Sequence, residues 1–550
     1  MTDRTFDRSL AVVGFGPRGL GALEALAVVA KTRNLGVKID IFDPSDALGA
    51  GPNFHPDESP LCLLNIPVRV LEIDPPDILR DQIDPFATWS QTSYAPDDFP
   101  PRCDLGAFLR ARFGALRTAS QGIFDISHIA AKATEVTRTD DGWRIVSGDT
   151  DHGPYDEVLL CPGQPATEPD PQLRRWSEHA DKNGLDLVPA YPATELVAAA
   201  EGWSGRHVAI RGLGLSTHDV LRMLTFGLSG RFEGGRYVRS GREPARILPF
   251  SRDGVPPAPK PATAEIDAMY DLRPNEAEAF QDALAEAVRQ GPKPALKTIC
   301  DVLVSPVMRI LTAMEAPHTE ATVRQWFDVE RSSPGTQDVQ DTVVALRTTI
   351  EMAHRRLPPS VGYVVGQLWR KLQNDIRSGV NRADLTADTA TAIVGFDEAM
   401  KRYSYGPPVT ASEQLLVLIE DGLVSLQAVD DPDIVLDPVG WRLIEGNDAT
   451  LAHVMVDGVL PSPSLENIVD PLIRGAVEDG LIAEVEDGFG ARTLPDGSLV
   501  ARNGDANAGL CLLGRLSLGS VIATDSLHDC FGASTHRWAE GVLARADGQV

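Results

Sequence analysis

The chain has 550 residues, too many for one hydrophobic core, so we expect two or three domains. Hydrophobic residues make up 43% and charged residues 23%, a balance that excludes wholesale disorder. The net charge of −27, from 51 basic and 78 acidic residues, argues against a nucleic-acid-binding protein, because binding a phosphate backbone requires a surplus of Lys and Arg.

The apolar stretches and the cysteines indicate in which cellular compartment the protein is expected. The longest apolar stretches, such as residues 25–30, are far shorter than the roughly 18–20 residues of a membrane span, and no stretch of signal-peptide length precedes the first predicted strand. The six cysteines include no CxxC pair, and the histidines form no cluster at metal-ligand spacing. We therefore expect a cytoplasmic protein with no metal site and neither a membrane nor a nucleic-acid partner.

The first predicted unit is a strand, a turn, a helix and a second strand. Residues 10–13 form a β-branched-rich run, residues 19–30 have the pattern of a helix with small residues, and VKIDIF (37–42) is an apolar strand. This is a βαβ unit of the expected size.

The turn of this unit has the sequence GFGPRG and fits the GxGxxG dinucleotide pattern. Gly14 permits the tight turn, Gly16 lets the backbone approach a pyrophosphate, and Gly19 allows the helix to pack closely on the strand. Pro17 and Arg18 lie in the same loop, where the helix N-terminus favours an anion.

Asp43 completes the pattern. It follows the second strand, 24 residues after Gly19, and is placed to accept hydrogen bonds from ribose hydroxyls. Strand, loop, helix, strand and acid together predict a dinucleotide site, and a glycine-rich turn without a ligand is the alternative.

A second strand–turn–helix pattern follows at residues 207–224, after a predicted hairpin (133–149) and a strand (157–161). Its loop contains Gly212, Gly214 and Ser216, with Thr217 in place of the third glycine. Two such loops about 200 residues apart indicate two dinucleotides, one tightly held and one exchanging. A packing turn without a ligand is the alternative here.

Basic residues cluster after the second unit. Arg239, Arg242 and Arg252 are candidates for binding the 2′-phosphate of NADPH, since guanidinium groups suit phosphate. Surface arginines paired with the abundant acids are the alternative, so NADPH is preferred to NADH without being required.

Helical periodicity dominates residues 264–430, for example at 276–290, 342–357 and 412–426. A final strand–loop–helix pattern spans 509–527, before a helix that ends near Arg545. We predict an α/β fold with two dinucleotide-binding, Rossmann-like domains and a largely helical inserted lobe. The predicted divisions are an FAD-binding domain (1–200), an NAD(P)-binding-like segment (201–263), the helical lobe (264–430) and a mixed segment that returns to the FAD-binding domain (431–550).

The assembled motifs resemble the bacterial FAD/NAD(P)-binding flavoproteins related to N-hydroxylating flavin-dependent monooxygenases. The resemblance rests on GFGPRG (14–19), DPSDALGAG (43–51), LCLLNIPV (61–68), FPPRCDLGAFL (99–109), YDEVLLCPGQP (155–165), GLGLSTHDVLRML (212–224) and GLCLLGRLSLGS (509–520). It implies FAD contacts at Gly163 and Gly514. Two departures stand out: Cys161-Pro162-Gly163 replaces the usual Ala-Thr-Gly, and Gly514-Arg515 replaces Gly-Asp, which puts Asp525 in doubt as the flavin-ribityl acid.

Three residues are candidates for the reaction itself. Asn65 is a candidate for a polar contact with the flavin or the nicotinamide. His55 is a candidate for binding substrate or cofactor, and Arg102 is a candidate for holding a carboxylate or the flavin phosphate. The alternatives are a turn residue for Asn65, a loop histidine for His55 and a surface ion pair for Arg102. Ser216 and Asp219 are candidates for nucleotide contact, with helix capping as the alternative for Ser216.

The resemblance implies N-hydroxylation of a small amine or amino acid with NADPH and O₂, the flavin supplying the chemistry. The absence of a cysteine pair disfavours a disulfide reductase, and the absence of a GxSxG elbow disfavours a serine hydrolase. A flavin dehydrogenase that never activates oxygen and a non-catalytic FAD-binding scaffold are the alternatives. The expected partner is a small-molecule substrate, and a homo-oligomer is compatible with the sequence.

Overall fold

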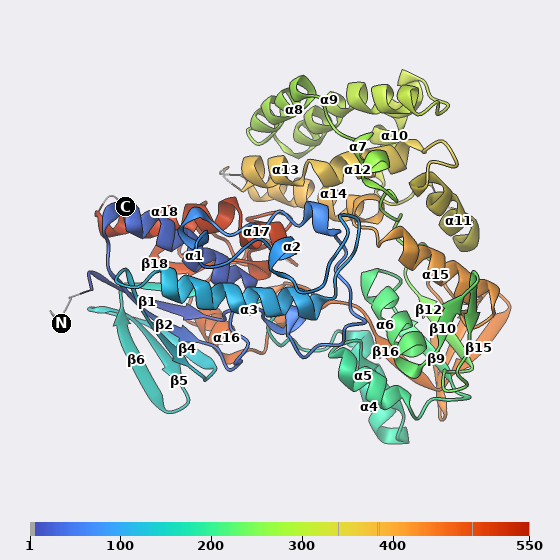
Figure 1. The fold of residues 1–550 in the computed structure, drawn as a ribbon, viewed down its shortest axis with the longest axis horizontal. Coiled ribbons are helices and arrows are strands. Elements are labelled where there is room, and N and C mark those ends of the chain that lie inside the picture. Colours follow the sequence, from blue (N-terminus) through green and yellow to red (C-terminus); the bar gives the residue numbers. More distant parts are fainter. Residues whose placement is uncertain (1–5, 339, 382, 384, 487, 549–550) are drawn as a thin grey trace.

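The computed structural model describes residues 6–338, 340–381, 383, 385–486 and 488–548. The first part of the molecule, on the left in Figure 1, contains a six-stranded sheet in the order β17-β18-β7-β1-β2-β3. All its strands are parallel except β17, which is antiparallel to β18. The strands are β1 (Arg8–Val13), β2 (Val37–Phe42), β3 (Phe124–Ile129), β7 (Glu157–Leu160), β17 (Ser498–Val500) and β18 (Ala506–Leu512).

Both faces of this sheet are covered, so its central strands are continuous apolar runs. One face carries α1 (Pro17–Arg33), α3 (Arg102–Ala119) and α18 (Ala533–Ala546), whose apolar side chains form one core. The other face carries α16 (Pro471–Glu478) and an antiparallel meander. The meander strands are β4 (Ala133–Thr139), β5 (Gly142–Ser147) and β6 (Thr150–Tyr155).

The second part contains a four-stranded parallel sheet in the order β12-β9-β16-β8. Its strands are β8 (Asp186–Pro189), β9 (His207–Arg211), β12 (Arg246–Phe250) and β16 (Val454–Asp457), accompanied by α4 (Pro171–Asn183), α5 (Ala193–Ala200) and α6 (Leu215–Thr225). A hairpin of β10 (Arg231–Glu233) and β11 (Arg236–Val238) precedes β12. A meander of β13 (Asp433–Asp437), β14 (Gly440–Glu445) and β15 (Asp448–Ala452) shares a small core with this sheet.

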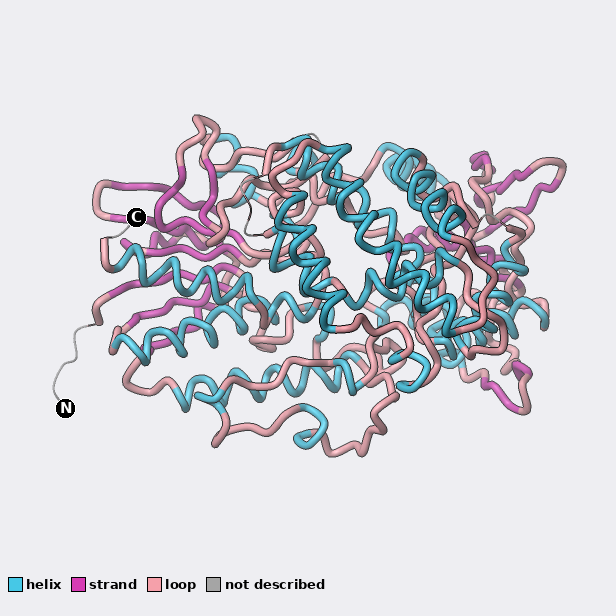
Figure 2. Tube along the Cα trace, turned by 90° about the horizontal axis from the view of Figure 1, so that it is seen from above, coloured by secondary structure: helices cyan, strands magenta, loops and turns pink. Residues whose placement is uncertain are grey.

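The helical lobe is inserted between β12 and β16, so that the second sheet is completed only after the lobe. Figure 2 shows helices between two groups of strands that lie toward opposite ends of the molecule. The lobe helices are α7 (Ala264–Ala268), α8 (Pro274–Ala287), α9 (Pro292–Ala313), α10 (Glu320–Ser332), α11 (Thr342–Ala353), α12 (Val361–Lys371), α13 (Gln373–Val380), α14 (Ala387–Ser404) and α15 (Val409–Glu420). Two short helices, α2 (Phe86–Trp89) and α17 (Leu527–Cys530), belong to the first part.

The predicted fold class is confirmed: two mainly parallel sheets, each with a glycine loop, and a helical lobe inserted in the second. The helix predicted over 412–426 ends earlier, at Glu420, because Gly422 adopts a φ of +69° and turns the chain. In the part of the chain that the structure describes, no helix has both the length and the apolarity to cross a membrane. The domain boundaries given above stay predictions.

Candidate functional site

The first glycine loop lies where β1 ends, beside the end of β7. Gly14 has a φ of +82°, and a Cβ atom there would lie 2.4 Å from the carbonyl oxygen of Cys161. At Gly19, a Cβ atom would lie 2.9 Å from the ring of Phe15. Both positions therefore require glycine, one for the turn and one for close packing.

Helix α1 begins at this loop with its backbone N–H groups uncapped. Gly16 is the residue before the helix, no side chain caps it, and the first turn contains Pro17 but no acid. Gly51, with a φ of +67°, lies against Gly16. A Cβ atom on Gly16 would be 3.5 Å from the Cα atom of Gly51. Unpaired N–H groups at a helix N-terminus, with little side-chain bulk around them, fit the diphosphate of a dinucleotide.

The carboxylate of Asp43 braces the same loop. One oxygen accepts from the backbone N–H of Phe15 at 2.6 Å and the other from that of Ser45 at 2.8 Å. Asp43 is half-buried, and its oxygens have lone pairs left for ribose hydroxyls. The predicted ribose contact stays a prediction.

Arg18 is buried and connects this loop to the C-terminal segment. Its guanidinium forms an ion pair with Asp529 at 2.6 Å and donates to the carbonyl oxygen of Thr524 at 3.0 Å. A Cβ atom at Gly514, whose φ is +110°, would lie 3.1 Å from the Nε atom of Arg18. Arg18 thus holds the start of α1 against residues that follow β18, and its charge is already balanced by Asp529.

Gly163 and Gly514 follow β7 and β18, at the same edge of the sheet as the first loop. The carboxyl edge of a parallel sheet is where such folds bind their ligands. Gln164, next to Gly163, accepts from Arg515 at 2.6 Å.

Arg515, which stands where an acid is expected, pairs with Asp525. Arg515 forms an ion pair with Asp525 at 2.6 Å, and Lys401 of the lobe adds a second at 3.3 Å. Burial would raise the pKa of Asp525, but these two cations outweigh it and hold that pKa below its usual range. The Asp525 carboxylate is thus engaged by protein cations.

The second glycine loop repeats the first at the end of β9. Gly212 has a φ of +116°, Gly214 precedes α6 without a side-chain cap, and a Cβ atom at Gly214 would meet nothing within 4 Å. Thr217 replaces the third glycine and donates its hydroxyl to the carbonyl oxygen of Gly212 at 2.8 Å. The capping alternative for Ser216 is wrong, because the helix starts one residue earlier and its N-cap is Gly214.

The structure does not bring Arg239 and Arg242 to this loop. Both precede β12, at the amino edge of the sheet, where Arg242 pairs with Glu201 at 2.9 Å. Arg252 instead follows β12 at the carboxyl edge, two residues beyond Phe250, whose carbonyl oxygen accepts from the N–H of Gly212 at 2.8 Å. Of these three arginines, only Arg252 is near the second loop.

Arg102 links the two parts of the molecule. It opens α3 in the first part, and its guanidinium pairs with Asp219 of α6 at 2.5 Å and donates to the carbonyl oxygen of Leu63 at 3.1 Å. Tyr191 also donates its hydroxyl to Asp219 at 2.5 Å, and its ring lies under the Arg102 guanidinium. Burial raises the pKa of Asp219, and Arg102 opposes this shift. Arg102 thus forms an ion pair, as the alternative reading expected, but the pair joins the two parts, with Asp219 buried and Arg102 half-buried; the predicted contact with substrate or flavin phosphate stays a prediction.

Asn65 and His55 lie on the segment that runs between the two parts. Within this segment, Leu61 accepts from the Arg222 side chain at 2.9 Å, and Glu58 accepts from the N–H of Ala193 at 3.1 Å. The Nδ1 atom of His55 accepts from the N–H of Asp57 at 3.2 Å, a local turn contact. Asn65 is half-buried; its predicted role and that of His55 stay predictions.

Sequence reasoning missed the partners Asp529, Tyr191 and Glu58. Arg18 and Asp529 are 511 residues apart, so no spacing rule connects them. Glu58 and Tyr191 lie in irregular segments without periodicity. Only the three-dimensional fold brings these residues together.

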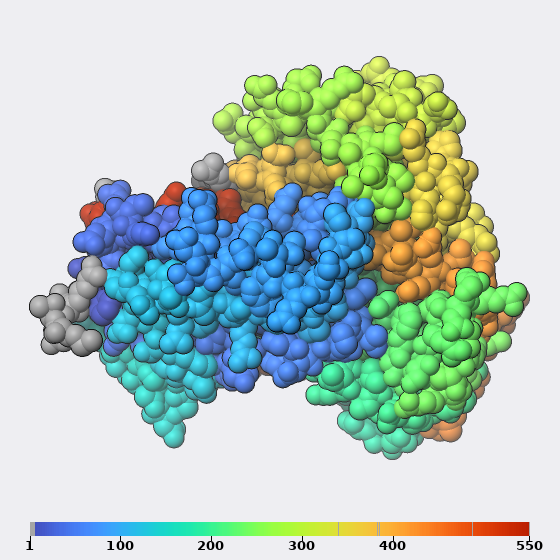
Figure 3. Space-filling view, in the orientation of Figure 1, coloured from blue at the N-terminus to red at the C-terminus, as the bar shows by residue number. Residues whose placement is uncertain are grey.

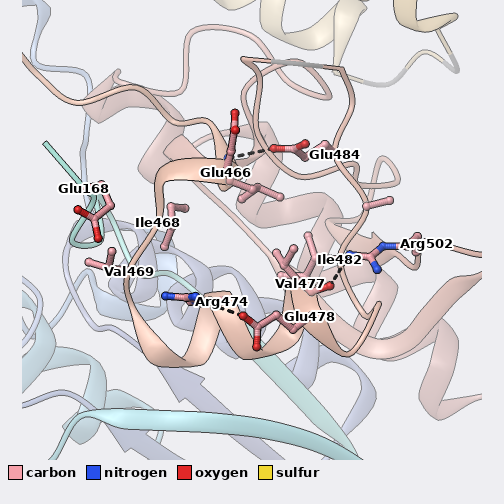
Figure 4. Close-up of a pocket in the computed structure, with 12 residues that line it drawn as sticks. Glu168, Glu466, Ile468, Val469, Arg474, Val477, Glu478, Ile482, Glu484 and Arg502 are labelled. Atoms are coloured by element: carbon pink, nitrogen blue, oxygen red, sulfur yellow. Dashed lines mark hydrogen bonds and ion pairs between the residues drawn. The ribbon is translucent and has the colours of Figure 1, made fainter. Parts of the chain in front are cut away.

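A separate hollow, with a volume of about 740 Å³, lies on the face of the first sheet that carries α16 (Figure 4). Its polar lining is mostly acidic, with Glu168, Glu466, Glu478 and Glu484 beside Arg474 and Arg502. No residue of either glycine loop lines it. It is therefore distinct from the candidate cofactor sites.

The chain is similar in sequence to one protein-family model and to known enzymes. The model of a family described as FAD-NAD(P)-binding matches residues 11–165. The nitrosuccinic acid synthase of Aspergillus oryzae is 26% identical over 539 residues, which cover 86% of this chain and 81% of the relative. An L-aspartate N-monooxygenase (nitrosuccinate-forming) of Streptomyces davaonensis is 25% identical over 570 residues, which cover 87% of this chain and 86% of the relative.

A solved structure, the reduced form of the ornithine hydroxylase PvdA from Pseudomonas aeruginosa, overlaps with a TM-score of 0.47 at 12% identity. The overlap covers 98% of this chain and 99% of that one. This similarity is too low for a comparison of individual sites.

Proposed function

We propose that this chain, an FAD/NAD(P)-binding flavoprotein related to the N-hydroxylating flavin-dependent monooxygenases, oxidises the amino nitrogen of L-aspartate. The observation that carries the proposal is how much of this chain matches two proteins that are named for forming nitrosuccinate. Each match covers at least 86% of this chain, far beyond the 11–165 range of the family model. The chain is an FAD-dependent oxidoreductase with a small-molecule substrate, and aspartate is our proposal for that substrate.

The first oxidation balances with one dinucleotide and one oxygen molecule. The amine, O₂, NADPH and a proton give the hydroxylamine, NADP⁺ and water. Bound FAD supplies the electron transfer and the activation of oxygen. The uncapped start of α1 would hold the FAD diphosphate, and the uncapped start of α6 would hold the nicotinamide dinucleotide.

Arg252 supports NADPH as the hydride donor. It is exposed, follows the strand next to the second loop, and has the guanidinium chemistry that binds a 2′-phosphate. We expect Arg252→Ala to raise the KM for NADPH by about tenfold, the worth of one charge-assisted phosphate contact, with little change for NADH. Arg242→Ala, at the opposite edge of the sheet, is the matched control and should change neither KM. An equal effect of Arg252→Ala on both dinucleotides would contradict the assignment.

The test of the function uses purified protein that retains its flavin. L-aspartate should stimulate both NADPH oxidation and O₂ uptake, and mass spectrometry should detect an aspartate product that has gained oxygen on nitrogen. Turnover that needs no oxygen but accepts an artificial electron acceptor would favour a dehydrogenase. Bound FAD that neither NADPH nor NADH reduces would favour a scaffold.

We also propose that the enzyme acts in the cytoplasm and binds neither membrane nor nucleic acid. The net charge of −27 supports the absence of a polyanion partner. Light scattering measures the mass of the protein in solution, and a multiple of the 59.2 kDa of one chain would identify a homo-oligomer. An electrophoretic mobility shift assay with duplex DNA should show no complex.

A further inference from the structure

One contact between the helical lobe and the C-terminal segment lies beside the first glycine loop. Asn381, at the end of α13, accepts from the backbone N–H of Ile522 at 2.9 Å. Two residues further along, the carbonyl oxygen of Thr524 accepts from Arg18 of α1. In Figure 1, α13 lies above the C-terminal segment that contains α17, and Figure 3 shows the lobe in contact with the N-terminal part.

Polar atoms at this contact are buried without hydrogen-bond partners. They are the Nδ2 atom of Asn381 and the Oγ1 atom of Thr524; the Oε1 atom of Gln373, at the start of α13, is likewise buried without a partner. Leaving a buried polar group unpaired is costly, so such a group in a folded protein calls for a ligand or an ordered water. Gln373, Arg377 and Asn381 are four residues apart and therefore share one face of α13.

Arg377, in the middle of this face, is a buried cation without a carboxylate partner. Counted as whole residues, three arginines in the described part of the chain are buried: Arg18 with 9% exposed, Arg112 with 1% and Arg377 with 6%. Arg18 pairs with Asp529, and Arg112 pairs with Glu24, each at 2.6 Å.

Arg377 donates to the amide oxygen of Asn374 on its own helix, and among the described residues no carboxylate forms an ion pair with it. Its charge acts on two groups of the C-terminal segment: burial lowers the pKa of His528 and raises the pKa of Cys530, and Arg377 adds to the first shift and opposes the second. Arg377 therefore lies close to that segment. A buried guanidinium with spare donors favours an anion, above all a carboxylate that can accept two parallel hydrogen bonds.

We propose that Arg377 binds a carboxylate of the amino-acid substrate, and that Asn381 and Thr524 supply neighbouring hydrogen bonds. The inference rests on the proposed function, because that function supplies a dicarboxylic substrate. It gives the lobe a direct role: α13 closes the substrate site over the C-terminal segment that Arg18 ties to the FAD loop.

The first test compares FAD-loaded wild type with Arg377→Gln, measuring L-aspartate binding by calorimetry. Loss of a charge-assisted carboxylate contact should raise Kd by about 10- to 100-fold. Flavin content and flavin reduction by NADPH without aspartate should not change. Arg324→Gln, which removes an exposed arginine of the lobe, is the matched control and should bind like wild type.

Substrate analogues identify the carboxylate. L-asparagine lacks the side-chain carboxylate, and aspartate 1-amide lacks the α-carboxylate. The Arg377→Gln penalty should disappear for the analogue that lacks the group bound by Arg377. An equal penalty for aspartate and both analogues would overturn the proposal.

Thr524→Val provides a second variant that does not depend on the charge. It removes a buried hydroxyl without a partner, so it should raise the unfolding temperature without aspartate and weaken aspartate binding about threefold to tenfold. A purely structural role for Thr524 would not produce these opposite effects.

The outcomes separate this inference from the function on which it rests. If wild type neither binds nor oxidises aspartate, the proposed function fails. If wild type binds aspartate and both Arg377→Gln and Thr524→Val bind it equally well, only this inference fails. Loss of FAD instead of aspartate from Arg377→Gln would assign the guanidinium to the flavin and overturn the proposal.

Discussion

At the scale of single residues, the first candidate cofactor site depends on glycines, which have no side chain. The φ of +82° at Gly14 is one that L-residues rarely adopt, and the carbonyl oxygen of Cys161 lies where a Cβ atom would be. The strain and the steric conflict act together at this position. The loop is thus determined by backbone geometry, and Asp43 fixes it further through the Phe15 N–H.

Gly14→Ala tests this directly. Because the loop must move to remove the conflict, we expect the variant to lose bound FAD and more than about 2 kcal/mol of unfolding free energy. The ratio of flavin to protein absorbance and urea unfolding measure the two effects. Gly114→Ala is the control: Gly114 lies inside α3 with nothing within 4 Å of a Cβ atom, so helix propensity should make this variant slightly more stable. Full flavin content in Gly14→Ala would contradict the argument.

At the scale of elements, local patterns predicted both βαβ units, because glycine spacing and strand periodicity are contained within about 30 residues. Such a local pattern does not predict at which edge of the sheet a residue lies. Arg242 and Arg252 are ten residues apart, yet β12 runs between them and places them at opposite edges. Contacts such as Arg18–Asp529 depend on the last strand returning to the first sheet, which no local signal encodes.

A buried histidine, His218, lies where α6 packs on α15. His218 of α6 is 7% exposed and lies among Leu415 and Leu418 of α15. Burial lowers its pKa to about 4, so the folded protein keeps this imidazole neutral at pH values where an unfolded chain would protonate it.

Stability should therefore fall as the pH drops from about 6.5 towards 4, since only the unfolded state takes up the proton over this range. The expected loss attributable to His218 is about 3 kcal/mol at pH 4, and the contribution is constant above about pH 7. Urea unfolding of wild type and His218→Gln across this range measures it, because the difference between the two removes the contribution of other titrating groups. Parallel stability profiles would show that His218 is not the cause.

At the scale of the whole molecule, hydride transfer requires the two dinucleotide sites to hold a fixed relation to each other. The contact of Arg102 with Asp219 and Tyr191 joins the start of α3 in the first part to α6 in the second, the helix that directly follows the second glycine loop. The side chain of Asp219 is 7% exposed and that of Arg102 is 21% exposed, so water compensates poorly for the loss of either charge. We therefore regard this contact as a positioning element between the two sites.

Asp219→Asn keeps the shape of the side chain and removes its charge, leaving the largely shielded Arg102 without a counter-ion. The expected cost is about 3 kcal/mol of unfolding free energy, together with slower reduction of the flavin by NADPH at saturating dinucleotide. The double variant Arg102→Gln/Asp219→Asn should recover much of the stability, because no unpaired charge is left. Its flavin reduction should stay slow, because the link between the parts is still weakened. Urea unfolding and stopped-flow absorbance measure the two quantities. If Asp219→Asn lost stability but reduced its flavin at the wild-type rate, the contact would stabilise the fold without positioning the two sites.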